Sequence, residues 1–343
     1  MKKAFITGGT GQDGAYLTKL LLDKGYEVHI GARRNADRSF WRLEALGINV
    51  NKDIKVVDFE LLESQAIARI IKEGQYDEFY NLGAQSFVAS SFNNPEYTIK
   101  TDGVAVVSEL EAIRRYSPHT KFYQASTSEL YGNSNVLRQN EETPLKPVSP
   151  YGLGKLLAHE AVRLYREAYG LKAVCGILYN HESTLRGSEF VSKKVVDYVR
   201  TVQAVGVTDN IKPLQIGNMD SKRDWGYAGD YVKAIYRINN QGIKVKAGKL
   251  KDYVVSTGEQ HTVRKLIELA FKKIGIEIKW VGSGKDEKGY YCGRCLVEVN
   301  PEFYRPSELR SLCGDSSRIR KELGWEPEVG FEELIEKMVK GEA

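Results

Sequence analysis

Two short stretches of the chain carry side chains that could move a proton and a hydride. Residues 126–129, Ser-Thr-Ser-Glu, supply hydroxyls and a carboxylate, and residues 149–155, Ser-Pro-Tyr-Gly-Leu-Gly-Lys, supply a phenol and an ammonium. A helix capped by Ser149, with proline at its first position, would place Tyr151 and Lys155 one turn apart on the same face. Because a nearby ammonium favours the phenolate, Tyr151 could deprotonate a hydroxyl while hydride leaves the same carbon.

The residues before this helix strengthen that interpretation. A tyrosine and a lysine four positions apart also occur by chance on exposed helices, so the pair alone is weak support. Residues 121–127, Lys-Phe-Tyr-Gln-Ala-Ser-Thr, predict a buried parallel strand that ends where Thr127, Ser128 and Glu129 begin to supply polar groups. Open α/β sheets bind ligands at that edge, and we expect a site there with both acid and base groups.

A glycine-rich loop near the N-terminus predicts a dinucleotide site. A short apolar strand is followed by Gly8-Gly-Thr-Gly11-Gln-Asp-Gly14, then by a helical pattern and a second strand over residues 27–34. This order of strand, loop, helix and strand favours dinucleotide binding over an ordinary glycine loop. Gly8 permits the tight turn, Gly11 lets a pyrophosphate approach the backbone, and Gly14 lets helix and strand pack.

The end of the second strand bears on the choice of cofactor. An NAD site usually has an acidic residue there for the ribose 2′-hydroxyl, whereas this strand ends with Arg33 and Arg34. Arginine suits a 2′-phosphate, so NADP is the better expectation. Two solvated arginines are the alternative.

The remaining pattern predicts the fold class. Strands are expected at residues 54–57, 78–83, 172–178 and 253–256, with a helix over residues 95–115. This alternation indicates an α/β protein with a Rossmann-type doubly wound parallel sheet and a smaller, mostly C-terminal α/β lobe for substrate. We expect the nucleotide-binding domain to comprise residues 1–180 and about 226–257, and the lobe to comprise about 181–225 and 258–343. Within the lobe, residues 282–293 are expected to form a polar loop.

Composition narrows the classes of partner. The 343 residues carry a net charge of +5 that is spread along the chain, so nucleic acid is not expected. No apolar run approaches the ~18 residues of a membrane span, and the chain starts on a strand without a leader, so we expect a cytoplasmic protein without membrane contact. Cys292-Gly-Arg-Cys295 is a single CxxC pair, and no metal site is expected.

At these residues the chain resembles the GDP-mannose 4,6-dehydratase family, within the extended short-chain dehydrogenase/reductase superfamily. The likeness runs nearly from end to end. It is carried by Thr-Gly-Gly-Thr-Gly-Gln-Asp-Gly-Ala-Tyr-Leu (7–17), Asn-Leu-Gly-Ala-Gln-Ser (81–86), Phe-Tyr-Gln-Ala-Ser-Thr-Ser-Glu (122–129), Ser-Pro-Tyr (149–151), Gly-Ile-Leu-Tyr-Asn-His-Glu-Ser (176–183), Lys-Arg-Asp-Trp-Gly (222–226), Tyr-Arg-Pro-Ser-Glu (304–308) and Leu-Gly-Trp-Glu-Pro (323–327).

The resemblance implies binding residues that spacing alone does not assign. It gives a cofactor role to His181, which as a lone histidine has none from the sequence itself. The NADP residues that it implies are Gly8, Thr10, Gly11, Gln12, Asp13, Gly14, Arg33, Asp58, Phe59, Leu82, Gly83, Ala84, Gln85, Ser86, Tyr97, Lys155, His181 and Arg186. Those implied for a GDP-sugar are Ser86, Ser128, Asn180, Lys194, Arg223, Arg305 and Glu308. The segment from Arg33 to Arg42 is implied to reach a neighbouring subunit, in a homotetramer or a dimer.

The implied reaction converts GDP-D-mannose to GDP-4-dehydro-6-deoxy-D-mannose and water. Tyr151, with its pKa lowered by Lys155, takes the proton of the C4 hydroxyl while C4 hydride passes to NADP. Glu129 removes the C5 proton, Thr127 helps the C6 hydroxyl leave, and hydride returns to C6. Ser126 or Ser128 is a possible helper of Thr127 in that step.

Two departures from the family pattern bear on the sugar. Residues 184–187 are Thr-Leu-Arg-Gly where the family usually has Pro-Arg-Arg-Gly or Pro-Leu-Arg-Gly, and Lys193-Lys194 stands for Arg-Lys. A GDP-heptose is therefore an alternative substrate. An epimerase or reductase of the same superfamily is a second alternative, and it has no use for the Glu129 carboxylate. A catalytically silent NADP-binding regulator is a third, and it would tolerate loss of Tyr151.

Overall fold

The computed structural model describes residues 1–34, 39–242, 249–304, 307, 309 and 311–342. Two of the expected substrate residues, Arg305 and Glu308, lie outside this described part of the chain.

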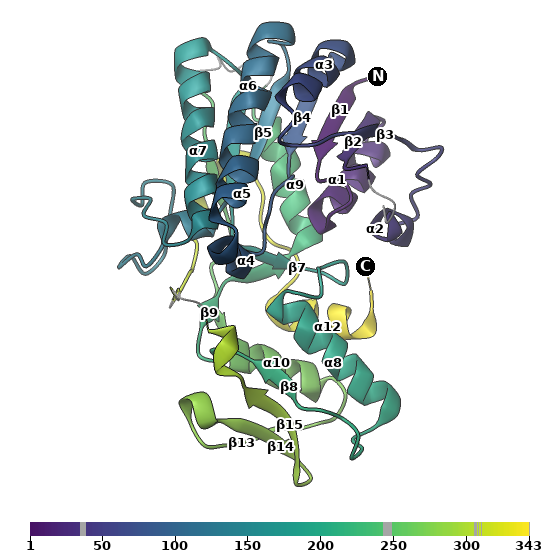
Figure 1. The fold of residues 1–343 in the computed structure, drawn as a ribbon, viewed down its shortest axis with the longest axis vertical. Coiled ribbons are helices and arrows are strands. Elements are labelled where there is room, and N and C mark those ends of the chain that lie inside the picture. The colour runs from purple at the N-terminus through teal and green to yellow at the C-terminus, as the bar shows by residue number, and fades with distance from the viewer. Residues whose placement is uncertain (35–38, 243–248, 305–306, 308, 310, 343) are drawn as a thin grey trace.

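A parallel sheet, together with the helices that cover it, forms the larger part of the molecule (Figure 1). Within the described ranges it has seven strands in the order β11-β6-β5-β4-β1-β2-β3. Their bounds are β1 Lys3–Thr7, β2 Glu27–Ala32, β3 Ile54–Asp58, β4 Glu78–Asn81, β5 Lys121–Thr127, β6 Ala173–Leu178 and β11 Tyr253–Val255. The predicted doubly wound α/β fold is confirmed, and the predicted strands all form.

The strand order explains where a ligand can bind. The chain runs outward from β1 through β2 to β3, then returns to place β4 on the other side of β1. The connections after β1 and β4 therefore leave the sheet in opposite directions and open a crevice at the carboxyl ends of the strands. All six positions of β6 are buried, as expected for a strand that is covered on both faces.

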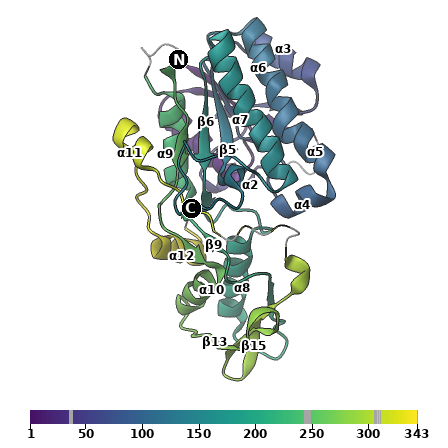
Figure 2. The same ribbon diagram turned by 90° about the vertical axis from the view of Figure 1, so that its left-hand side faces the viewer.

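Helices cover both faces of the sheet, as Figure 2 shows with α9 on one side and α6 and α7 on the other. Helix α9 packs on α1 and the short α2 lies beside α1, whereas α3, α6 and α7 cover the opposite face. The bounds are α1 Gln12–Asp23, α2 Trp41–Ala45, α3 Ser64–Gly74, α4 Val88–Asn93, α5 Pro95–Ile99, α6 Ala105–Tyr116, α7 Pro150–Tyr169, α9 Ala228–Asn239 and α11 Ser317–Leu323.

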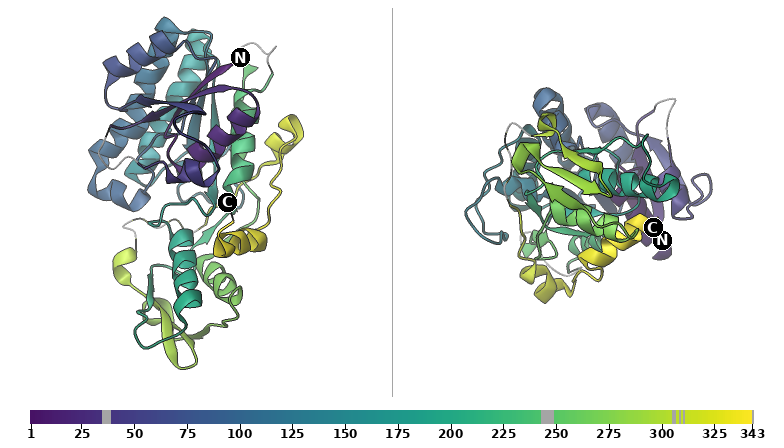
Figure 3. Two further views of the ribbon diagram at one scale, coloured as in Figure 1. Left: turned by 90° about the vertical axis from the view of Figure 1, so that its right-hand side faces the viewer. Right: turned by 90° about the horizontal axis from the view of Figure 1, so that it is seen from below.

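A smaller group of elements lies beyond the carboxyl edge of the sheet (Figures 1 and 3). Its helices share an apolar cluster in which Val199, Leu266 and Ile335 are fully or almost fully buried. Its helices are α8 Val191–Val205, α10 Val263–Lys272 and α12 Phe331–Lys340. Its strands are β8 Leu214–Ile216, β13 Lys279–Val281, β14 Lys288–Tyr291 and β15 Arg294–Val299, which form one sheet in the order β13-β14-β15-β8.

Short strands link the two groups of elements. They are β7 Asn180–Glu182 paired with β10 Trp225–Tyr227, and β9 Lys222–Arg223 paired with β12 His261–Thr262. The predicted domain boundaries near residues 180, 225 and 257 stay a prediction.

The helix expected over residues 95–115 is not continuous. A π-helical turn, η1 Lys100–Val104, separates α5 from α6. A Cβ on Gly103 would lie 2.8 Å from the backbone oxygen of Gly154, so η1 packs directly against α7. A helix that widens at one turn can follow such a close neighbour, and sequence periodicity does not reveal this.

The loop expected over residues 282–293 was also a wrong prediction. It contains a 3-10 turn, η4 Gly284–Asp286, and then β14, which pairs with β15 in a hairpin. Cys292 and Gly293 form the hairpin turn with φ of 48° and 77°. Positive φ at both central residues matches the twist of the flanking strands.

The four cysteines are free. Among the described residues, no helix combines the length and apolar character that crossing a bilayer requires.

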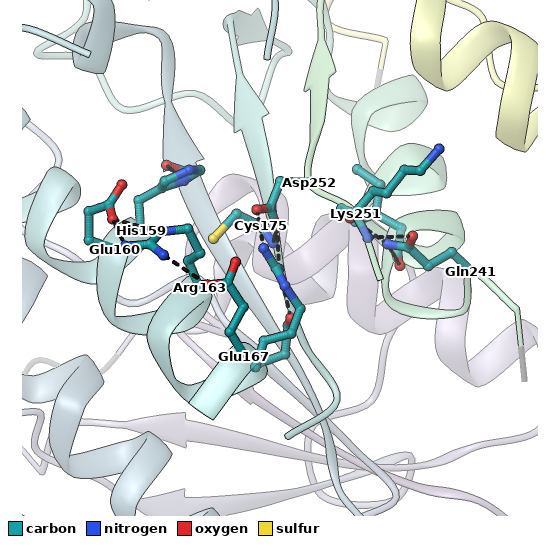
Figure 4. A network of polar contacts seen from close by, with 12 residues as sticks. His159, Glu160, Arg163, Glu167, Cys175, Gln241, Lys251 and Asp252 are labelled. Carbon is teal, nitrogen blue, oxygen red and sulfur yellow. Dashed lines mark hydrogen bonds and ion pairs between the residues drawn. The ribbon is translucent and has the colours of Figure 1, made fainter. Parts of the chain in front are cut away.

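A buried ion pair fastens α7 to the edge of the sheet. Arg166 of α7 donates two hydrogen bonds of 2.8 Å to Asp252, at the start of β11, and a third of 3.0 Å to the Ala173 oxygen. Asp252 also accepts a 2.6 Å bond from the Cys175 backbone nitrogen (Figure 4). Every charged atom of the pair is therefore matched, which is the condition under which burying it is tolerated.

Breaking this pair should destabilise the protein strongly. Asp252→Ala leaves the guanidinium of Arg166 buried without its partner, and we expect a loss of about 3–5 kcal/mol in the free energy of unfolding. The neighbouring Lys251→Ala removes an ion pair with Glu322 that is half exposed, and it should cost about 0–1 kcal/mol. Urea denaturation of both variants measures the difference, and equal losses would contradict the role given to Asp252.

Candidate active site

One large cavity lies between the carboxyl edge of the sheet and the smaller group of elements. Its volume is about 1030 Å³, more than a single small ligand needs. It is lined by residues of the glycine loop, the end of β5, the start of α7, β7 and α8, and by the segment around residues 302–304. The cavity therefore joins the two stretches from which the sequence predicts chemistry and cofactor binding.

The glycine loop after β1 has the shape predicted for it. Gly8 has a φ of 66°, and a Cβ on Gly14 would lie 2.3 Å from the Gly8 oxygen. Gly11 precedes α1 without a side-chain cap, and both Gly11 and Gly14 line the cavity at this helix N-terminus. A helix N-terminus with bare N–H groups binds anions, and a bulkier loop would not close in this way.

Helix α7 holds Tyr151 and Lys155 as predicted. The Ser149 hydroxyl accepts a 3.0 Å hydrogen bond from the Gly152 nitrogen, which is the expected cap. Both Tyr151 and Lys155 line the cavity, and the Lys155 nitrogen lies 5.9 Å from the centre of the Tyr151 ring. Lys155 also donates a 3.1 Å bond to the Ala125 oxygen, which fixes its side chain against β5.

The end of β5 brings the other predicted catalytic groups, Thr127 and Glu129, to the cavity that Tyr151 and Lys155 line. Thr127 and Glu129 line the cavity, and the Thr127 hydroxyl accepts a 3.2 Å bond from the Glu129 nitrogen. This bond turns the chain into η2 Ser128–Tyr131 and keeps the hydroxyl beside Tyr151. Ser126 lines the cavity too, and its hydroxyl is 3.2 Å from the ring of His159 on α7.

The protonation of Tyr151 differs from the prediction. Burial raises the pKa of its phenol well above the ordinary value, and the Asp102 carboxylate raises that pKa further. The hydrogen bond with Thr127 lowers it only in part. The net shift is therefore upward and not downward, because the desolvation of a phenolate outweighs the groups that stabilise it, and the contribution of Lys155 stays a prediction.

His181 forms an ion pair at the cofactor end of the cavity. Its Nε2 lies 2.8 Å from an Asp13 oxygen and its Nδ1 lies 2.6 Å from the Tyr179 oxygen. Burial lowers the pKa of the imidazole, but Asp13 more than offsets this and the pKa is raised. His181 therefore ties β7 to the first turn of α1, next to the glycine loop.

Cations lie against aromatic rings at two places on the cavity wall. The Lys194 nitrogen is 4.0 Å from the centre of the Phe303 ring, and the Arg186 guanidinium carbon, on the side of Asp13 and His181, is 3.6 Å from that of Phe190. Arg223 is buried and donates a 2.9 Å bond to the Leu309 oxygen. Such surroundings suit a diphosphate and a flat base.

Most of the predicted binding residues line this one cavity. The cofactor residues on its surface are Gly8, Gly11, Gln12, Asp13, Gly14, Arg33, Leu82, Ala84, Ser86, Lys155, His181 and Arg186. The substrate residues on its surface are Ser86, Ser128, Asn180, Lys194 and Arg223. Their individual roles stay predictions.

Other predicted cofactor residues are not part of the lining. Phe59 is buried with its ring centre 5.2 Å from that of Phe5, and Tyr97 lies exposed on α5. Gln85 is engaged with Thr98 and the backbone. The lining also lacks Thr10, Gly83 and Asp58. Thr10 and Gly83 are sequence neighbours of the lining residues Gly11 and Leu82, and Asp58 is the last residue of β3.

Several lining residues carried no usable sequence signal. Arg42 donates a 2.7 Å hydrogen bond to the Leu185 oxygen. It donates a second, of 3.3 Å, to the oxygen of Thr10 in the glycine loop. The others include Phe87, Glu189, Phe190 and Phe303, which come from loops or helix ends far apart in the chain. Only the folding of the smaller group of elements over the sheet brings them together.

A dinucleotide fits the residues present. Gly11 leaves room for a pyrophosphate at the start of α1, where a Cβ would approach the Gly8 oxygen to 3.2 Å. Arg33 lies on the cavity surface at the end of β2, where the second ribose phosphate of NADP would lie. Lys155 and Tyr151 line the same cavity.

Solved structures with the same fold act on sugar nucleotides. A dTDP-glucose 4,6-dehydratase from Streptomyces venezuelae, with NAD bound, matches 99% of this chain and 96% of its own with a TM-score of 0.81 and 20% identity. A UDP-glucose 4-epimerase from Thermotoga maritima matches 99% and 98% with a TM-score of 0.80 and 22% identity. At this identity the likeness establishes the fold.

Sequence comparison gives a sharper result. The chain is 42% identical over 359 residues to a GDP-mannose 4,6-dehydratase of Yersinia enterocolitica, covering 100% of this chain and 94% of that protein. It is 42% identical to the human GDP-mannose 4,6 dehydratase, covering 98% and 90%. The family model described as GDP-mannose 4,6 dehydratase matches residues 5–338. The chain therefore belongs to the GDP-mannose 4,6-dehydratase family.

Proposed function

We propose that this protein is an NADP-dependent enzyme that converts GDP-D-mannose to GDP-4-dehydro-6-deoxy-D-mannose and water. One observation carries the proposal: a phenol, an ammonium, a hydroxyl and a carboxylate meet on one wall of a cavity that also contains a dinucleotide loop. The activity printed for relatives that are 42% identical over nearly their whole length agrees with it.

Each group has a distinct task in this scheme. Tyr151 accepts the proton of the C4 hydroxyl as the phenolate, and Lys155, with its nitrogen 5.9 Å from the centre of the Tyr151 ring, supplies the positive charge that favours that phenolate. The glycine loop and Arg33 would hold NADP, which would supply the hydride acceptor for C4 and the hydride donor for C6. The ketone at C4 acidifies C5, so the carboxylate of Glu129 can remove that proton. Thr127 donates a hydrogen bond to the C6 hydroxyl, which leaves as water with the proton that Tyr151 took from the C4 hydroxyl, and Glu129 returns its proton to C5 when C6 receives hydride.

Glu129 separates this proposal from an epimerase or reductase. Glu129→Gln keeps the shape of the side chain but cannot accept the C5 proton, so product formation should fall by at least about 10²-fold. NADP affinity should not change. Mass spectrometry of GDP-mannose incubations measures the product that is lighter by one water.

Glu142→Gln is the matched control, since Glu142 is an exposed carboxylate paired with Arg318 outside the cavity. Full activity of Glu129→Gln would contradict the elimination step. An incubation with a GDP-heptose in place of GDP-mannose distinguishes the two substrates.

Arg33 supports NADP rather than NAD as the cofactor. Arg33 is among the residues that line the cavity, whereas Arg34 is not. Arg33→Ala should weaken NADP binding about 10- to 100-fold, because a charge-assisted bond to a phosphate contributes about 1.5–3 kcal/mol. NAD binding should change little.

Isothermal titration calorimetry with both cofactors measures these affinities, and Arg34→Ala is the control. An equal loss for NADP and NAD in Arg33→Ala, or no loss for either, would count against 2′-phosphate recognition.

The segment from Arg33 to Arg42 supports a homo-oligomer. Trp41 is exposed, with the Arg42 guanidinium carbon 4.6 Å from its ring centre, and an exposed tryptophan is typical of an interface. Residues 35–38 of this segment lie outside the described residues. The predicted cytoplasmic location also stays a prediction.

The oligomer is tested by sedimentation velocity. The protein should sediment as a dimer or tetramer of the 38.6 kDa chain, and Trp41→Ala should shift the population toward monomer. A monomeric wild-type protein at micromolar concentration would refute the assembly.

A further inference from the structure

A row of aromatic side chains marks one face of the parallel sheet. The register places Phe5 of β1 opposite Phe79 of β4, and Phe79 opposite Phe122 of β5. Their ring centres are 5.1 and 5.6 Å apart, and all three rings are fully buried. Ala158 and Val162 of α7 belong to the same apolar cluster, so this is the face that α7 covers (Figure 2).

Two positions further along these strands, the same face carries a row of polar side chains. They are Thr7, Asn81 and Gln124, which the register again sets side by side. Side chains two positions apart in a strand point to the same face, so the polar row follows the aromatic row at the carboxyl edge. Thr7 and Asn81 are 1% exposed and Gln124 is fully buried. None of the three is among the described residues that line the cavity, so the proposed chemistry gives them no role.

A chain of hydrogen bonds runs along this polar row. The Thr7 hydroxyl donates to the Asn81 side-chain oxygen at 2.5 Å, and the Asn81 side-chain nitrogen donates to the Gln124 Oε1 at 2.8 Å. Gln124 in turn donates a 2.9 Å bond from its Nε2 to the Ala125 carbonyl oxygen. That oxygen also accepts the 3.1 Å bond from the Lys155 ammonium, so the chain ends where the predicted catalytic lysine is held.

The two ends of the chain fix the direction of every bond in it. At one end, the backbone N–H groups of Leu82 and Gly83 donate to the Thr7 hydroxyl oxygen at 3.1 and 2.9 Å, which leaves the hydroxyl proton for the next acceptor. At the other end, the Ala125 carbonyl can only accept. Each amide between these ends must therefore accept with its oxygen and donate with its nitrogen. Turning either amide round would set donor against donor and acceptor against acceptor.

Gln124 is the member of this chain that reaches the anchor of Lys155. Lys155 is 3% exposed, and an ammonium buried to this extent needs well-placed acceptors. A carbonyl oxygen that a second donor also holds keeps its direction, because turning the peptide would break both bonds. Lys155 lies one helical turn from Tyr151, with its nitrogen 5.9 Å from the ring centre. A shift of the ammonium therefore changes its distance from the phenol.

We propose that Gln124 is a positioning residue for the dehydration, which holds Lys155 in place through the Ala125 carbonyl oxygen. Its other bond, to Asn81, ties this anchor to the end of β4. Gln124 touches neither substrate nor cofactor in this role and acts through Lys155. The inference rests on the proposed function for its activity test, whereas its structural test does not depend on that function.

Gln124→Met is the variant that tests the donated bond. Methionine has a similar length, and its sulfur is a weak acceptor for the Asn81 amide, but it cannot donate to the Ala125 oxygen. The kcat for GDP-mannose should fall about 10- to 100-fold, because a displacement of about 1 Å in a catalytic group costs up to about 10²-fold. KM should change by less than about twofold, since Gln124 does not line the cavity. Steady-state kinetics measures this split, and an unchanged kcat would overturn the proposal.

Gln139→Met is the matched control for the loss of a buried amide. Gln139 is 2% exposed, and its amide also bonds at both ends, accepting from the Tyr179 hydroxyl at 2.9 Å and donating to the Val136 oxygen at 2.7 Å. It is not among the lining residues of the cavity. Both variants should lower the melting temperature, but Gln139→Met should keep its kcat near the wild-type value. An equal loss of kcat in the two variants would mark a general effect of destabilisation and would rule out the positioning role.

A second variant covers the case in which Gln124→Met does not fold. Asn81→Leu is then combined with it, because replacing both partners of a buried hydrogen bond by apolar groups of similar shape leaves neither amide unpaired. The double variant should show the same fall in kcat with KM little changed. Wild-type kcat in the folded double variant would contradict the role of the chain.

A crystal structure of Gln124→Met, or of the double variant, tests the inference without the reaction. The distance from the Lys155 nitrogen to the Ala125 oxygen should grow beyond about 3.5 Å, so that the hydrogen bond is lost. If the wild-type protein does not convert GDP-mannose, the proposed function fails, and this distance still decides the positioning role. A retained hydrogen bond between Lys155 and the Ala125 oxygen would overturn it.

Discussion

The structure depends on burying one ammonium group between a helix and a strand. Lys155 lies one turn after Tyr151 on α7, with its nitrogen 5.9 Å from the centre of the Tyr151 ring and hydrogen-bonded to the Ala125 oxygen of β5. Bringing η1 close to α7 requires Gly103 and Gly154 where the two helices touch. The same closeness removes water, so charge differences between a few side chains decide the protonation of the site.

The cavity is formed by two groups of elements whose apolar cores are separate. One core lies on the faces of the parallel sheet and the other beneath α8, α10 and α12. Polar groups gather between them because β5 and β7 end there, and α7 begins there. His181 and Asp13 join the two sides at the cofactor end through a 2.8 Å contact. A ligand that bridges both groups of elements can therefore touch the catalytic wall and the lobe at once.

Much of this arrangement could be predicted because it follows from local rules. The Ser149 cap, the glycines of the first loop and the apolar β5 each depend on residues within one turn or one strand. Parallel strands end at a common edge, so the meeting of Thr127, Glu129 and Tyr151 also followed from the order of elements. The hairpin at Cys292 was missed because β14, Lys-Gly-Tyr-Tyr, is short and begins with a lysine and a glycine, which are both depleted in strands.

The sequence by itself determined the fold class, the nucleotide loop and the residues that carry the proposed chemistry, since short-range spacing specifies caps, turns and strand ends. Only the tertiary structure decided how deeply those residues are buried and in which direction burial shifts the pKa of Tyr151. The π-helical turn, the burial of Asp102 and Glu109, and the raised pKa of Tyr151 all arise from contacts between elements some fifty residues apart. A pKa depends on what surrounds a group in space, and no spacing along the chain records how much water the neighbouring helices exclude.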